Sequence, residues 1–130
     1  RLAALLKQHQ PALVVIELGG NDALRGLPLD MTADNLNAMT QAARAAGAHV
    51  LLLGMQMPPN YGADYGKRFA ELYAKVAAAH KAALVPFFLK GIADDTDPLR
   101  WFQADRIHPL ASAHPRLLDN VWPTLAKLLK

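Results

Sequence analysis

Three short and nearly continuous apolar runs stand out along the chain, at Ala12–Leu18, His49–Met55 and Leu84–Phe87. Runs of this length bounded by glycine or proline are typical of parallel strands that are covered on both faces. Pro86 lies within the third run. Because proline cannot donate a hydrogen bond to a sheet, Pro86 predicts an edge strand or the end of a strand.

Apolar residues at helical spacing fill the intervals between these runs. They predict an opening helix around Leu2–Leu6 and further helices over Leu36–Ala46, Phe69–His80 and Leu117–Leu129. Pro11 ends the first helix, and Gly47 is a typical stop for the second. Pro123 lies inside the last helix, where we expect it to kink or divide the element.

The alternation of helices and strands predicts a parallel sheet with right-handed crossovers. The length of 130 residues indicates a single domain, and 52% hydrophobic with 19% charged residues is ordinary for a globular protein. No internal repeat or linker interrupts the pattern. The segment Leu89–Asp105 predicts a long loop, and long loops in compact domains are often functional.

Composition excludes several classes of function. The absence of cysteine excludes a disulfide framework, a cysteine nucleophile and thiolate metal sites. A net charge of +3 with scattered basic residues argues against nucleic-acid binding. No apolar run approaches the roughly 20 residues of a membrane span. Three aspartates near one another, Asp94, Asp95 and Asp97, are better interpreted as a solvated acidic loop than as a metal site.

Three polar groupings follow the three predicted strands: Gly19–Asp22, Met57–Gly62 and Asp105–Pro109. In an open α/β sheet, ligands bind outside the carboxyl ends of the strands. We therefore expect these groupings to converge on one edge of the sheet and to form a single site.

Asp105 and His108 have the spacing of a base and the group that orients it. An aspartate three residues before a histidine can accept a hydrogen bond from Nδ1–H, which leaves Nε2 free as a general base. The same spacing also fits an aspartate that caps a turn beside an exposed loop histidine. The residues alone leave both interpretations open.

Asn21 follows two glycines directly after the first strand. Glycine allows a sharp turn and close approach of the backbone to a ligand. The asparagine amide can then donate a hydrogen bond to an oxyanion in the crevice. A plain turn is the alternative, because glycine, asparagine and aspartate are common turn residues.

Taken in order, the GGND segment after a strand and the D-x-x-H-P segment before the last helix resemble the SGNH (GDSL-type) hydrolase family. The resemblance is closest to bacterial esterase, acyl-CoA thioesterase and lysophospholipase members, and extends through ALLKQHQP, ELGGNDALRG, PPNYG, VPFF and DRIHP. It implies a three-layer α/β/α sandwich with a flavodoxin-like parallel sheet. It further implies hydrolysis of carboxylic esters or thioesters through an acyl-enzyme, no cofactor or metal, and a periplasmic or secreted location.

The same resemblance assigns roles to individual residues. Asp105 and His108 match two members of a catalytic triad, and Asn21 matches a donor of the oxyanion hole. The family's G-D-S-L block, which holds the nucleophilic serine, has no counterpart here, and Ser112 is the only serine. We expect Ser112 to help start the last helix instead.

These observations predict that residues 1–130 form the C-terminal two-thirds of one SGNH hydrolase domain that lacks its N-terminal strands. The expected partners are a small acyl ester or thioester substrate and the missing N-terminal segment, without which the chain is expected to be inactive. We expect the substrate to bind between two walls, Gly20, Ala23 and Leu24 on one side and Met57, Pro58 and Tyr61 on the other. The alternative is a non-catalytic α/β binding or interaction module.

Overall fold

The computed structural model describes residues 1–130 and contains a parallel sheet of three strands. The strands β1 (Leu13–Ile16), β2 (His49–Leu53) and β3 (Ala83–Val85) lie side by side in chain order. Leu13 pairs with His49 across the first ladder, and Leu51 pairs with Ala83 across the second. The predicted parallel sheet is confirmed, although each strand is shorter than its apolar run.

The helices that flank the sheet overlap the predicted apolar stripes, although two of them begin well before their stripes. They are α1 (Leu2–His9), α3 (Leu29–Ala45), α4 (Ala63–His80) and α5 (His114–Leu128). Of the kink or division expected at Pro123, the division is wrong, because α5 continues through that residue. Pro123 lies on the exposed side of α5, while Val121 and Leu125 pack towards the sheet around it. Packing on both sides of the proline therefore keeps the helix intact despite one missing N–H donor.

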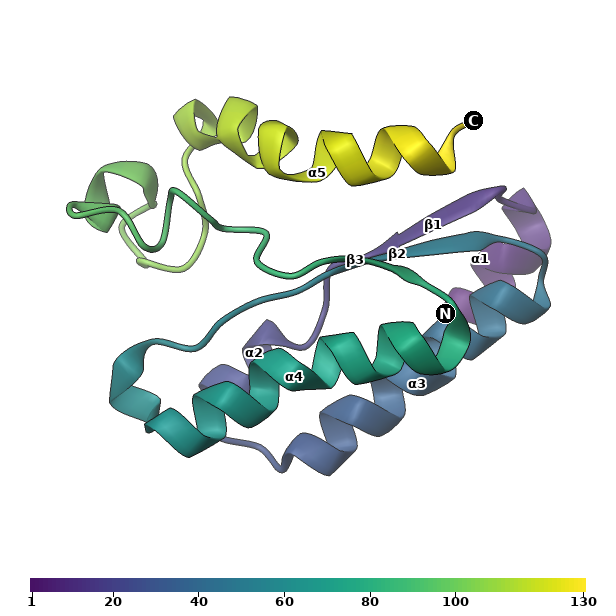
Figure 1. The fold of residues 1–130 in the computed structure, drawn as a ribbon, viewed down its shortest axis with the longest axis horizontal. Coiled ribbons are helices and arrows are strands. Elements are labelled where there is room, and N and C mark those ends of the chain that lie inside the picture. Colours follow the sequence, from purple (N-terminus) through teal and green to yellow (C-terminus); the bar gives the residue numbers. More distant parts are fainter.

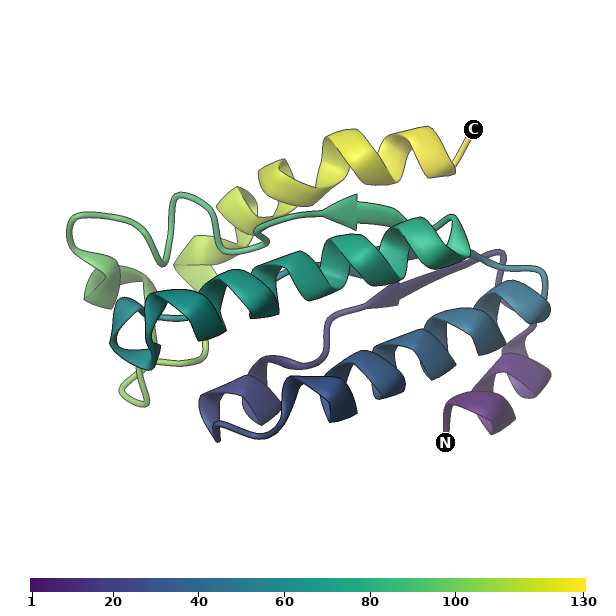
Figure 2. The same ribbon diagram turned by 60° about the horizontal axis from the view of Figure 1, so that its bottom comes forward.

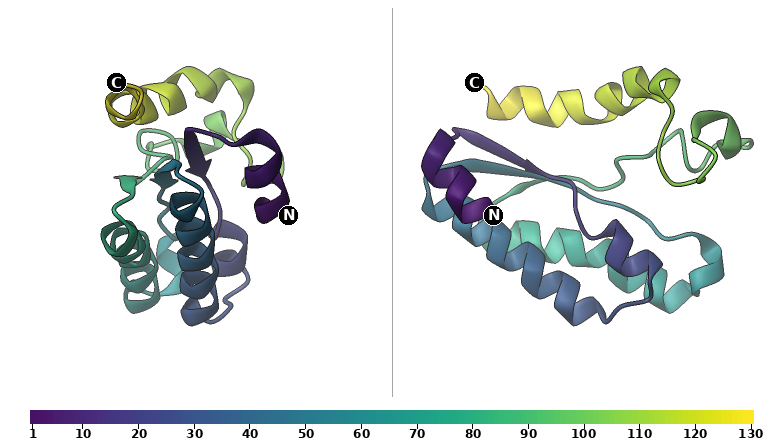
Figure 3. Two further views of the ribbon diagram at one scale, coloured as in Figure 1. Left: turned by 90° about the vertical axis from the view of Figure 1, so that its right-hand side faces the viewer. Right: turned by 180° about the vertical axis from the view of Figure 1, so that it is seen from behind.

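Helices cover both faces of the sheet, so the molecule has three layers (Figure 1). Figure 3 shows α5 alone above the sheet, with α3 and α4 on the opposite face. Neighbouring residues of β2 point to different layers: Leu52 belongs to the core under α3 and α4, and Leu51 packs with Val121 of α5. The predicted α/β/α sandwich is confirmed.

The edge of the sheet at β1 is less completely covered than its centre. Figure 2 shows α1 beside α3 at the end of the molecule where β1 begins. On the α5 face, Val15 of β1 is 46% exposed, and Leu118 and Trp122 of α5 are 57% and 51% exposed. An apolar surface therefore remains open between β1 and α5. No helix of the chain has both the length and the apolar character that crossing a bilayer requires.

Short elements connect the sheet to the helices on the side where the strands end. They are the helix α2 (Gly20–Leu24) and three 3₁₀ turns, η1 (Pro59–Tyr61), η2 (Pro98–Trp101) and η3 (Ala111–Ala113). The long segment between β3 and α5 is held by a small core of its own, in which Ile92, Ala113 and Leu117 are buried. This core fixes the loop that carries the third polar grouping.

Candidate active site

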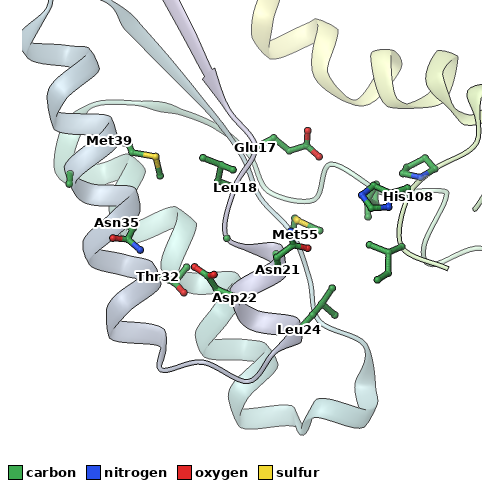
Figure 4. Close-up of a pocket in the computed structure, with 16 residues that line it drawn as sticks. Glu17, Leu18, Asn21, Asp22, Leu24, Thr32, Asn35, Met39, Met55 and His108 are labelled. Atoms are coloured by element: carbon green, nitrogen blue, oxygen red, sulfur yellow. The ribbon is translucent and has the colours of Figure 1, made fainter. Parts of the chain in front are cut away.

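A cavity lies at the carboxyl end of the sheet, and two of the three predicted polar groupings line it (Figure 4). Gly19 to Asp22 contribute one wall, and Ile107 to Pro109 contribute another. Met55, just after β2, lies between them in the lining. Asn21 and His108, which lie far apart in the sequence, therefore face the same space.

The turn after β1 is determined by a close approach between Gly19 and a buried tyrosine. Gly19 has φ +104°, and a Cβ at this position would lie 2.7 Å from Oη of Tyr73. That hydroxyl donates a hydrogen bond of 2.8 Å to the carbonyl of Leu18. Burial raises the pKa of Tyr73 well above its ordinary value, and the carboxylates of Asp22 and Glu17 act in the same direction. Tyr73 therefore serves here as a neutral hydrogen-bond donor.

Asn21 stands in the first turn of α2, which the sequence predicted only as a turn. The helix begins directly after Gly19, and the N–H of Ala23 donates to the carbonyl of Gly19 at 3.1 Å. Because α2 starts shortly after the end of β1, the Asn21 amide is held by a helix at the carboxyl end of the sheet rather than by a free loop.

Asp105 and His108 form a compact hydrogen-bonded pair. One carboxylate oxygen of Asp105 accepts from the backbone N–H groups of Ile107 and His108, at 2.9 and 3.0 Å. The other lies 2.5 Å from Nδ1 of the His108 ring. The His108 side chain, followed by the two backbone donors, lowers the pKa of Asp105 to about 2. Asp105 is therefore anionic at neutral pH and fixes Nδ1, which leaves Nε2 as the basic atom of the ring.

Glu17 is a residue of the cavity that sequence reasoning missed. It follows β1 directly and lines the cavity together with His108. Figure 4 shows its carboxylate pointing towards the His108 side of the cavity. Although the residue as a whole is exposed, partial desolvation raises the pKa of its carboxyl, with His108 opposing the shift. The available signal was a single acidic residue within the otherwise apolar run Ala12–Leu18.

The predicted substrate walls occupy two different positions. Gly20 and Leu24 line the cavity, whereas Ala23 is fully buried behind it. The remaining three, Met57, Pro58 and Tyr61, lie outside the lining. Tyr61 instead donates a hydrogen bond of 2.9 Å to the carbonyl of Leu24. The second wall thus lies outside the cavity lining and contacts the first wall through Tyr61.

Neighbouring residues on α3 complete the cavity opposite His108. Thr32, Asn35 and Met39 line it, and sequence reasoning assigned them no role. The Thr32 hydroxyl is buried without a hydrogen-bond partner. Ser112 lies on the exposed turn η3 and does not line the cavity. No group of three or more histidine, aspartate or glutamate side chains has an arrangement that could hold a metal ion.

The arrangement places an oriented base and an amide donor around one open space. His108 can exchange a proton through Nε2, while the Asn21 side chain can donate to a developing negative charge. Such a pair suits the transfer of an acyl group to a hydroxyl and then to water.

Comparison with known proteins gives a consistent assignment. Residues 1–116 match the model of the GDSL-like Lipase/Acylhydrolase family. The chain is 57% identical over 129 residues to Esterase TesA of Pseudomonas aeruginosa, and this match covers 99% of this chain and 63% of that relative. It is 43% identical over 119 residues to thioesterase 1/protease 1/lysophospholipase L1 of Escherichia coli, covering 92% of this chain and 56% of that protein. The chain therefore spans about three-fifths of the length of these curated relatives.

Solved structures show the same fold. A crystal structure of TesA superposes with a TM-score of 0.92 at 57% identity, covering 98% of this chain and 69% of that one. The psychrotrophic esterase EstA from Pseudoalteromonas sp., inhibited by monoethylphosphonate, gives a TM-score of 0.86 at 37% identity, covering 97% of this chain and 67% of that one. Because the family model matches residues 1–116, which is most of this chain, the chain belongs to the GDSL-like lipase/acylhydrolase family, whose members are also called SGNH hydrolases.

Proposed function

We propose that the full-length protein hydrolyses carboxylic esters or thioesters through an acyl-enzyme, with His108 as the general base and acid. The observation that carries this proposal is the hydrogen-bonded Asp105–His108 pair beside the cavity that Asn21 also lines. The similar proteins support it, because their names describe esterases, a thioesterase and a lysophospholipase.

In this mechanism Nε2 of His108 takes the proton of a serine hydroxyl while its oxygen attacks the carbonyl carbon of the substrate. Asn21 donates a hydrogen bond to the oxyanion that forms. His108 then gives the proton to the departing alcohol or thiol, leaving an acyl-serine. A water molecule, deprotonated by His108, attacks the acyl group. His108 then returns this proton to the serine oxygen as the acyl–serine bond breaks, which releases the carboxylic acid and restores the serine. Asp105 remains anionic and holds the ring throughout.

The nucleophilic serine is proposed to lie in a segment that precedes this chain in the full-length protein. Ser112 is exposed and outside the cavity lining, so its hydroxyl does not share a space with His108. We propose that this segment also covers the apolar surface between β1 and α5, and that the 130-residue chain by itself is inactive. A periplasmic or secreted location remains part of the proposal, on family resemblance alone.

The cavity favours an acyl group as the part of the substrate that it holds. Leu18, Met39 and Met55 give its lining apolar surface, and methionine adapts to chains of different shape. Gly20 and Leu24 are proposed to contact the substrate directly. We also propose that four residues outside the cavity lining help to shape the substrate-binding site: Ala23, Met57, Pro58 and Tyr61.

Labelling with a fluorophosphonate, together with turnover of a short-chain ester, tests the proposal in the full-length protein. We expect covalent labelling of one serine and loss of both labelling and turnover in His108→Ala. His49→Ala is the matched control, because His49 is exposed at the amino end of β2, away from the cavity. Wild-type turnover in His108→Ala would refute the proposed role of His108. Absence of both labelling and turnover in the wild-type full-length protein would favour a non-catalytic binding module.

A further inference from the structure

The long loop between β3 and α5 contains an interaction that the proposed mechanism does not use. We expected Asp94, Asp95 and Asp97 to be a solvated acidic loop, which is wrong for Asp95, because its side chain is only 13% exposed. Its Oδ2 accepts hydrogen bonds from Nε1 of Trp101 at 2.7 Å and from the guanidinium of Arg100 at 2.9 Å. The Trp101 donor is the main reason that the pKa of Asp95 lies well below its ordinary value.

Trp101 is also held by two arginines and by α5. The guanidinium carbons of Arg100 and Arg116 lie 4.7 and 5.1 Å from the centre of the Trp101 ring. Arg116 belongs to α5, and its Nη1 donates to the carbonyl of Gly91 at 3.0 Å. The ring packs beside the small core of Ile92 and Leu117. Trp101 is therefore tied both to the loop and to the helix that follows it.

The backbone of Trp101 forms the base of the hairpin that carries the catalytic pair. Its carbonyl accepts from the N–H of Leu110 at 2.7 Å. One step nearer the tip, Phe102 and Pro109 form an antiparallel bridge. Beyond that bridge, the N–H of Gln103 donates to the carbonyl of His108 at 2.8 Å. Asp105 and His108 thus stand at the tip of a hairpin whose base is fixed by one tryptophan.

We propose that Trp101, held by Asp95 and Arg116, is a positioning residue for the Asp105–His108 pair. The hairpin lies outside the sheet, so its orientation towards Asn21 depends on what holds its base. A loss of the Trp101 contacts allows the hairpin to rotate as a unit, which moves Nε2 of His108 without breaking the bond between His108 and Asp105. The inference rests on the proposed function, because it concerns the placement of that base.

Trp101→Phe in the full-length protein is the direct test. Phenylalanine keeps an aromatic ring against the arginines but removes the N–H donor to Asp95. Because a displacement of about 1 Å can reduce a rate by as much as 10²-fold, we expect kcat for a short-chain ester to fall by about tenfold, with KM changed less than about twofold. Trp122→Phe is the matched control, because it makes the same change of side chain on α5 at a residue that neither lines the cavity nor belongs to the hairpin.

A second pair of variants separates positioning from general stability. Asp95→Ala removes the acceptor for the Trp101 N–H, whereas Asp95→Asn keeps a side-chain oxygen there. We expect Asp95→Ala to lower kcat as Trp101→Phe does and Asp95→Asn to restore most of it. The proton NMR signal of His108 Nδ1–H should persist in all of these variants, because the hydrogen bond inside the pair is retained.

The outcomes distinguish this inference from the proposed function. If His108→Ala is inactive but Trp101→Phe and Asp95→Ala have the kcat of Trp122→Phe, the positioning role is refuted and the mechanism stands. Equal rates in Asp95→Ala and Asp95→Asn would also refute it. If His108→Ala itself retains activity, the mechanism fails first. Assays well below the unfolding temperature of each variant keep loss of folded protein out of the comparison.

Discussion

Replacing Gly19 with alanine should destabilise the protein and damage the site for the same physical reason. Gly19 has φ +104°, and an added Cβ would lie 2.7 Å from Oη of Tyr73 and 3.2 Å from Cγ2 of Thr32. Tyr73 is 1% exposed and its hydroxyl is bonded to the carbonyl of Leu18, so the ring has little room to retreat. Alanine therefore adds backbone strain and also forces apart a buried contact.

The two contributions can be estimated separately. The left-handed backbone costs a residue with a Cβ about 1–2 kcal/mol. Breaking the buried hydrogen bond of Tyr73 costs about 1–3 kcal/mol more, because its donor and acceptor lose their partners. Gly26→Ala is the matched control, since Gly26 has φ +69° with nothing within 4 Å of an added Cβ. We expect Gly19→Ala to exceed this control by about 1–3 kcal/mol in the free energy of unfolding.

Urea unfolding of the full-length protein, repeated in a Tyr73→Phe background, measures this difference. Phenylalanine removes the atom nearest to the added Cβ and leaves the ring carbon at 3.6 Å, an ordinary contact. The extra cost of Gly19→Ala should therefore shrink in that background, giving a measurable coupling energy. The kcat for a short-chain ester should fall more in Gly19→Ala than in Gly26→Ala, because Gly19 sets the start of α2 and hence the place of Asn21. Equal destabilisation by the two substitutions, with no coupling to Tyr73, would refute this reasoning.

Three other predictions concern Asn21, Asp105 and the core. Asn21→Ala should lower kcat by about 10²–10³-fold with little change in KM, whereas a change in KM alone would make Asn21 a substrate-binding residue. The pKa of Asp105 is lowered to about 2 in the folded protein, against about 3.9 in an unfolded chain. Asp105 therefore contributes stability that is present above about pH 4 and is lost as the pH falls through about 2, so urea titrations should show a weaker acid dependence in Asp105→Asn. Leu52→Ala, at a fully buried position, should reduce the free energy of unfolding by about 2–5 kcal/mol, and Leu129→Ala, at a 60% exposed one, by less than about 0.5 kcal/mol.

The fold could be predicted from the sequence where a regular pattern repeats along the chain. The stripe on Phe69–His80 gave α4 because buried residues recur on one face of a helix, and Phe69, Tyr73 and Val76 are indeed in the core. Strand ends were harder to predict, since the apolar run His49–Met55 continues past β2. Met55 lies beyond the end of β2 and lines the cavity. From its residue type alone, an apolar residue that lines a cavity cannot be distinguished from one in a buried strand.

The helix α2 was missed because its sequence has no helical stripe. It spans only Gly20–Leu24, and two of those residues are glycine and asparagine, which favour turns. What holds it is tertiary contact, because Ala23 is fully buried and the Tyr61 hydroxyl donates a hydrogen bond to the carbonyl of Leu24. A contact between residues far apart in the sequence can override the local preference for a turn, and the local sequence does not indicate such a contact.

In the candidate site, too, contacts between residues close in the sequence could be predicted more easily than contacts between distant ones. The Asp105–His108 bond joins residues three apart, so their spacing allowed it in advance, although the same spacing also fitted an aspartate that caps a turn beside an exposed histidine. The position of Glu17 beside His108 depends on how the hairpin folds back over the end of β1, and the spacing of residues carries no information about that approach. The contact between Trp101 and Asp95 is local in sequence but lies in an irregular loop, where no period tells which aspartate turns inward. Both unpredicted features lie outside the segment that contains the Asp105–His108 motif. A motif can therefore identify the Asp105–His108 pair, while the surroundings of that pair depend on packing that the motif does not contain.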